Sequence, residues 1–137
     1  MTAVRRRPIL VVGDESNTPQ LMAELRRLGR IAVWVEACGS AQEMIETVRF
    51  GLVIVSVERR AGWASCRRLA AASDCPVVVA TRFLASDRRY RNRAFRAGIT
   101  GYMCRPFSRR RLREMLTRVG AGERSIELVE GAPYSDG

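Results

Sequence analysis

A chain of 137 residues is long enough for one domain with a buried core, since folding buries about 68% of the surface of a chain of ~150 residues. Its formal net charge is +10, every basic residue is arginine, and it contains no histidine. The lack of histidine removes the commonest acid–base group at neutral pH and argues against hydrolytic or group-transfer chemistry. The basic charge would attract nucleic acid or an acidic protein.

The four cysteines occur without a C-x-x-C pair, and the first residues lack the pattern of a secretory signal. We expect reduced thiols, as in cytosolic proteins. No apolar run approaches the ~18 residues of a membrane span. These features predict a soluble cytoplasmic protein without membrane attachment.

Apolar runs bounded by turn residues predict five strands, and they lack the polar alternation of a strand with one wet face. Such strands suit a parallel sheet that is covered on both faces. The predicted strands are residues 8–12, 32–35, 52–57, 76–80 and 101–104.

Helical patterns lie between the strands, near residues 18–28, 41–49, 62–72, 86–97 and 108–119. Thr18 is predicted to cap the first helix, with Pro19 at its first position, and Ser108 to cap the last. In the second helix, the apolar face is expected to include Val48. The alternation of strands and helices predicts a doubly wound α/β fold.

The two ends of the chain differ in composition from the alternating part. Residues 1–7 form a basic arm, residues 8–119 the domain, and residues 120–137 an acidic tail. The segment "SIELVEG" within the tail is open to two interpretations, an added edge strand or a disordered segment.

Several motifs together resemble the receiver domain of bacterial response regulators, over about residues 8–119. The most specific is "RAGITGYMCRPF" (96–107), which resembles the family's fifth strand with its following basic residue, proline and aromatic residue. "PILVVGDES" (8–16) and "CPVVVAT" (75–81) resemble the first and fourth strands. The resemblance implies a flavodoxin-like (βα)5 fold with five parallel strands in the order 2-1-3-4-5.

In that family, an acidic pair after the first strand binds Mg²⁺ and an aspartate at the end of the third strand accepts a phosphoryl group. A hydroxyl and a lysine, at the ends of the fourth and fifth strands, bind that group, and an aromatic residue on the fifth strand acts as a switch. The resemblance places these positions, in the same order, on Gly13 and Asp14, Ser56, Thr81, Arg105 and Tyr102.

Three of the five pocket positions therefore lack the family's residue. Mg²⁺ requires hard oxygen ligands, and Asp14 with Glu15 or Glu58 would make a poor magnesium site, so we expect no cofactor. Acyl phosphate formation requires a carboxylate, and no histidine is present to activate Ser56. Ser56 is then either a small residue in a disused pocket or the substrate of a serine kinase.

Arg105 offers a second contrast with the family's lysine, because a guanidinium is planar, forked and always charged. One hypothesis is that Arg105 forms a bidentate pair with Asp14 and locks the pocket; the alternative is that it points to solvent. The loops after residues 57 and 81 also differ in length from the family, so coupling between Thr81 and Tyr102 is not assumed.

Arginines crowd the last two predicted helices, which form the usual dimer or partner face in the family. We expect this face to bind an acidic signalling protein, phosphates or the chain's own acidic tail, or to be solvated surface. A homodimer through helix four, strand five and helix five is a further possibility, but like charges should weaken it unless acidic residues interleave. These arginines are Arg88, Arg89, Arg91, Arg93, Arg96, Arg109, Arg110, Arg111, Arg113 and Arg118.

The leading interpretation is a non-catalytic receiver that serves as a phosphorylation-independent interaction module in signalling or transcription control. One alternative is a working phospho-receiver with an unusual acceptor. Another is a basic nucleic-acid-binding regulator, although no sequence-reading motif supports specific recognition.

Overall fold

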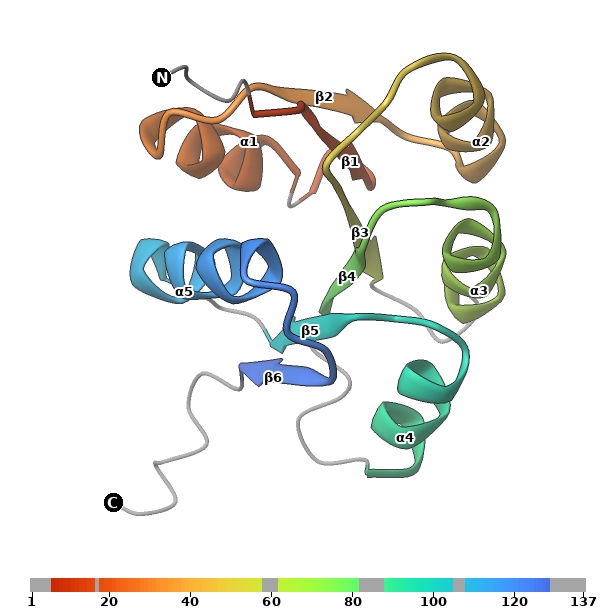
Figure 1. Ribbon diagram of the computed structural model, residues 1–137. Coiled ribbons are helices and arrows are strands. Elements are labelled where there is room, and N and C mark those ends of the chain that lie inside the picture. Colours follow the sequence, from red (N-terminus) through yellow and green to blue (C-terminus); the bar gives the residue numbers. More distant parts are fainter. Residues whose placement is uncertain (1–5, 17, 58–61, 82–87, 105–107, 129–137) are drawn as a thin grey trace.

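The computed structural model describes residues 6–16, 18–57, 62–81, 88–104 and 108–128. It contains one six-stranded sheet in the order β2-β1-β3-β4-β5-β6, in which every neighbouring pair of strands is parallel (Figure 1). The strands are β1 (Ile9–Val12), β2 (Ala32–Val35), β3 (Leu52–Val57), β4 (Val77–Thr81), β5 (Gly101–Cys104) and β6 (Ile126–Leu128). The helices are α1 (Thr18–Arg27), α2 (Cys38–Thr47), α3 (Gly62–Ala72), α4 (Arg88–Arg96) and α5 (Arg109–Gly120).

The helices form a layer on each face of the sheet, with α1 and α5 on one face and α2, α3 and α4 on the other (Figure 1). Because successive strand residues point to opposite faces, each central strand supplies both cores. Leu10 and Val53 pack toward α2 and α3, whereas Ile9 and Ile54 pack toward α1 and α5. This double burial explains the continuous apolar runs in the sequence.

The predicted α/β fold and strand order are confirmed, but the sheet has six strands instead of five. The bounds predicted for β2, β3 and β5 agree with the structure, that for β1 differs by one residue at its start, and that for β4 is shifted by one residue at both ends. The sixth strand pairs with β5 in the register Gly101↔Ile126. Of the two interpretations of the "SIELVEG" segment, the edge strand is the one observed for residues 126–128.

Close approach between β5 and β6 depends on Gly101. A Cβ atom at that position would lie 3.0 Å from the Cβ of Ile126 and 3.2 Å from the sulfur of Met115. Ile126 and Leu128 are buried against the α5 face of the sheet, while Glu127 points to the other face. The alternating pattern of these three residues is that of a strand with one covered face.

Two local predictions about the helices are wrong and one is confirmed. Val48 follows the end of α2 in an extended conformation and is 37% exposed, so it does not belong to the apolar face of that helix. Thr18 is the first residue of α1, and its hydroxyl makes no hydrogen bond within the described ranges, so it does not act as the predicted cap. Ser108 caps α5, because its Oγ accepts a hydrogen bond from the backbone N–H of Arg111 at 3.1 Å.

Among the residues that the structure describes, no helix is long and apolar enough to cross a bilayer.

Candidate functional site

The predicted site lies at the carboxyl edge of the sheet, where β1, β3, β4 and β5 end. The register pairs Val12 with Val55, so Gly13 and Ser56 follow side by side. Thr81 pairs with Val57 on one side and with Cys104 on the other. The structure therefore brings three of the predicted site positions, Gly13, Ser56 and Thr81, to one edge.

Gly13 occupies a position with no room for a side chain. A Cβ atom there would lie 2.6 Å from the Oγ1 of Thr18 and 2.8 Å from the Cβ of Ser56, which is closer than such atoms approach in proteins. The first helix and the third strand thus fill the space into which the family's carboxylate would project. The sequence shows that this carboxylate is missing, and the structure shows that its place is closed.

The backbone of Gly13 is held from the neighbouring strand β2. Its N–H donates to the carbonyl of Val35 at 3.1 Å, and its carbonyl accepts a hydrogen bond from the indole Nε1 of Trp34 at 2.7 Å. Both contacts come from a strand that the sequence interpretation did not connect with the site. They fix the end of β1 against movement toward a ligand.

Thr18 is a site residue that the sequence interpretation missed, because it considered this residue only as a helix cap. Its side chain is fully buried, and its Oγ1 has no hydrogen-bond partner in the described part of the chain. An unpaired buried hydroxyl costs free energy. The short connection between β1 and α1 is the only sequence signal that places the first residue of the helix above the strand end.

The acidic residues after β1 are exposed and turned toward solvent or their own loop. The Oδ1 of Asp14 accepts a hydrogen bond from the backbone N–H of Ser16 at 3.0 Å, and Glu15 is exposed. Within the described ranges, no group of three or more histidine, cysteine, aspartate or glutamate residues is arranged to hold a metal ion. Mg²⁺ needs hard oxygen ligands, and the closed position at Gly13 supplies none; the predicted loss of a magnesium site stays a prediction.

Glu58 and Arg105 lie outside the described residues. The predicted pair between Arg105 and Asp14 therefore stays a prediction, as does the contribution of Glu58.

The two hydroxyl residues of the predicted pocket differ in their surroundings. Ser56 is half-buried and, by strand alternation from Ile54, lies on the face covered by α1 and α5. Thr81 is fully buried and, by alternation from Val79, lies on the opposite face. The closed space at Gly13 is thus next to Ser56 and not next to Thr81.

The predicted switch residue Tyr102 is held in the core instead of standing free. It is 1% exposed and stacks on Phe95 of α4 with ring centroids 5.9 Å apart. Its hydroxyl donates to the Oε1 of Glu127 at 3.4 Å, across the β5–β6 pair. This contact involves the sixth strand, so the sequence interpretation, which expected five, did not include it. Coupling between Thr81 and Tyr102 stays untested.

The structure describes only some of the side chains in the predicted arginine face. The described side chains of Arg89, Arg93, Arg96 and Arg110 are exposed, whereas those of Arg88 and Arg91 lie outside the described residues. Strand β6 pairs with β5 between α4 and α5, so the edge strand of this surface is β6, whereas the predicted face named strand five (Figure 1). The homodimer prediction remains open, but its strand would be β6.

Acidic residues of the same chain neutralise part of α5. The Nε of Arg109 donates to the Oε1 of Glu24 on α1 at 2.6 Å, and this bond is the main cause that lowers the pKa of Glu24. The Nε of Arg118 donates to the Oε1 of Glu123 at 2.8 Å. Arg111 lies 3.8 Å from Glu114. Several arginines of this helix therefore serve contacts within the chain.

No protein-family model and no curated protein matches the sequence. Solved structures do match the fold. A two-component response regulator from Clostridium difficile has a TM-score of 0.74 at 19% identity, covering 85% of this chain and 97% of that chain. The receiver domain of an HD domain-containing protein from Pseudomonas fluorescens has a TM-score of 0.73 at 20% identity, covering 86% and 97%.

A third structural neighbour holds a metal ion. The receiver domain of a sensor histidine kinase from Pseudomonas aeruginosa has a TM-score of 0.69 at 24% identity and covers 85% of this chain and 99% of its own. That structure holds a magnesium ion coordinated in the active-site cleft. The chain described here has the receiver fold, and the predicted resemblance is confirmed at that level.

Proposed function

We propose that this chain is a cytoplasmic receiver-type signalling module that acts without accepting a phosphoryl group and without catalytic activity of its own. The signalling role is carried over from its structural neighbours, which include response regulators and the receiver domains of histidine kinases. At these identities the likeness establishes only the fold, so the role rests on the site.

The single observation that carries the proposal is the closed position at Gly13. Phosphoryl transfer to a receiver needs a carboxylate nucleophile and a cation that neutralises the transferring oxygens. Here the residue at the acceptor position is Ser56. The space that a side chain at residue 13 would enter is occupied by the side chains of Thr18 and Ser56. The same packing that excludes a carboxylate at residue 13 removes a ligand for the cation.

The output is proposed to be binding of an acidic protein partner. The exposed arginine side chains of α4 and the first turn of α5 lie on either side of β6 and give this end of the molecule a positive surface. Such a surface would steer an acidic partner toward the protein, and the association rate would fall with added salt.

The deciding experiment is incubation of the protein with acetyl phosphate and Mg²⁺, followed by intact-mass measurement. We expect no species heavier by about 80 Da, the mass of one phosphoryl group. The Ser56→Asp variant is the matched test, because it restores the acceptor but not the space at Gly13, and we expect it to remain unmodified too. A receiver with an intact acidic site serves as the positive control.

A magnesium-dependent adduct on the unaltered protein, lost in a Ser56→Ala variant, would contradict the proposal and support the unusual acceptor.

A further inference from the structure

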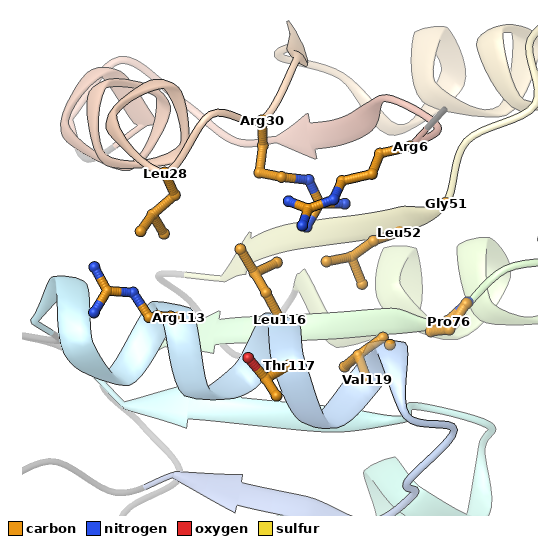
Figure 2. A pocket seen from close by; sticks show the side chains of 11 residues that line it. Arg6, Leu28, Arg30, Gly51, Leu52, Pro76, Arg113, Leu116, Thr117 and Val119 are labelled. Carbon is orange, nitrogen blue, oxygen red and sulfur yellow. The ribbon is translucent and has the colours of Figure 1, made fainter. Parts of the chain in front are cut away.

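A hollow lies at the amino-terminal edge of the sheet, at the end opposite the closed receiver site. It has a volume of about 750 Å³ and opens between the end of α1 and the last turns of α5 (Figure 2). Small-molecule sites in proteins usually measure about 300–1,000 Å³. The hollow is therefore large enough for a ligand the size of a nucleotide.

Three arginines line this hollow, and no aspartate or glutamate is among its lining residues. Arg6 precedes β1, Arg30 follows α1, and Arg113 belongs to α5, so three separate elements supply the charge. Figure 2 shows the guanidinium groups of Arg6 and Arg30 together on one side of the hollow and that of Arg113 on the other. Two charges, those of Arg6 and Arg30, thus come together on one side of the hollow, while the guanidinium group of Arg113 lies apart from them.

Arg30 carries an unsatisfied donor. Its Nε atom is buried and has no hydrogen-bond partner in the part of the chain that the structure describes. Burial, and then the nearby charge of Arg6, lower the pKa of its guanidinium. A partly desolvated cation beside a second cation is unfavourable unless an anion compensates it.

The rest of the lining is largely apolar. Leu28, Leu52 and Leu116 line the hollow beside the arginines, and Pro76 and Val119 lie at its far end (Figure 2). The hydroxyl of Thr117 belongs to the same lining. A ligand matched to this hollow would join a compact anion to an apolar body.

We propose that this hollow binds a small organic phosphate of mononucleotide size, with its phosphate between the arginines and its apolar body against the leucines. Phosphate fits because guanidinium groups bind it through paired, charge-assisted hydrogen bonds. Arg6 and Arg30, whose guanidinium groups lie together at the hollow, supply such donors. This inference does not depend on the proposed signalling role, since it concerns the opposite edge of the sheet.

The test is isothermal titration calorimetry at fixed ionic strength with four probes. These are adenosine 5′-monophosphate, 1-naphthyl phosphate, inorganic phosphate and uncharged adenosine. We expect at least one of the two organic phosphates to bind at least about tenfold more tightly than either phosphate or adenosine, because only the organic phosphates engage both the arginines and the apolar lining. The proposal is overturned if neither does.

The Arg30→Met variant removes the charge and keeps an apolar stem. We expect it to weaken organic phosphate binding by about tenfold or more, as loss of a charged hydrogen-bond donor does. The matched control is Arg67→Gln, an exposed arginine of α3 that is not part of the hollow. It lowers the net charge equally and should change the dissociation constant by less than twofold.

A second readout separates a ligand-binding arginine from a structural one. Without ligand, Arg30→Met should keep or raise the melting temperature, because it removes an uncompensated cation. A melting temperature several degrees below that of Arg67→Gln would mean that Arg30 is a structural residue and would refute the proposal. Equal loss of binding in both variants, together with tight binding of a short oligonucleotide, would instead indicate a diffuse nucleic-acid surface.

Discussion

Substitution of Gly13 by alanine tests whether the receiver site is closed by packing. Gly13 is not among the glycines with positive φ, so alanine is compatible with its backbone. By itself such a change usually stabilises a protein by about 0.4–1 kcal/mol through the entropy of the unfolded chain. The new Cβ, however, would meet Thr18 Oγ1 at 2.6 Å and Ser56 Cβ at 2.8 Å. Overpacking of this kind costs about 1–3 kcal/mol.

We expect Gly13→Ala to lower the free energy of unfolding by about 2 kcal/mol, measured by urea denaturation. Gly39→Ala is the matched control, since nothing lies within 4 Å of a Cβ at that position in α2. The control should raise stability, by up to about 1 kcal/mol, because alanine is the better helix former and Gly39 lies in the first turn of α2. The two substitutions are therefore expected to change the free energy of unfolding in opposite directions, which distinguishes a closed position at residue 13 from an open one.

A double-mutant cycle with Thr18→Ala tests whether the loss of stability in Gly13→Ala comes from the contact between the new Cβ and the Oγ1 of Thr18. Removing Oγ1 relieves the shorter of the two contacts, so the double variant should be more stable than the sum of the single changes by about 1 kcal/mol. If Gly13→Ala stabilised the protein as Gly39→Ala does, the site would be open. The argument against a carboxylate at residue 13 would then fail.

Three further predictions concern the sixth strand, the buried hydroxyl and a buried thiol. Ile126→Ala should cost about 2–4 kcal/mol in urea denaturation, since three buried carbons are lost at ~0.8 kcal/mol each and a cavity remains, whereas Glu127→Gln should change little. Thr18→Val should raise stability by about 1 kcal/mol in the same assay, because it keeps the shape and removes an unpaired hydroxyl. Burial raises the pKa of Cys66 from 9.0 to about 12, so iodoacetamide at pH 8 should modify it only as the protein unfolds. The protonated thiol is favoured in the folded state, so stability should be intact below pH 9 and decline toward pH 12, less steeply in Cys66→Ala.

The sequence predicted most of the fold because the central strands are buried on both faces. Their apolar runs are long, and turn residues bound them, so the predicted bounds of β2, β3 and β5 coincide with the observed ones. The sequence left undecided whether residues 126–128 form a strand, because the alternating apolar pattern there is only three residues long. Ile126 and Leu128 become recognisable as core residues only when β5 and α5 are in place beside them.

The sequence predicted which residues lie at the candidate site, but not that packing closes the site at Gly13. The family resemblance placed Gly13, Ser56 and Thr81 at one edge, and the register brings them there. The closure by Thr18 depends on a contact between a helix start and two strand ends, which no local pattern contains. The cationic hollow was missed for the same reason, because Arg6, Arg30 and Arg113 are far apart in sequence and belong to separate elements.

The two edges of the sheet differ in what a ligand could gain from them. A ligand shifts a conformational equilibrium only through a difference in its interaction with the two states. At the carboxyl edge, the packing of Thr18 and Ser56 around Gly13 leaves a phosphoryl group and its cation no oxygen ligand at that position. At the amino-terminal edge, Arg6 and Arg30 lie together in a hollow whose lining contains no aspartate or glutamate, so an anion there would relieve the repulsion between two cations. Binding of a phosphate group is therefore physically better supported at the amino-terminal edge of this sheet than at its carboxyl edge.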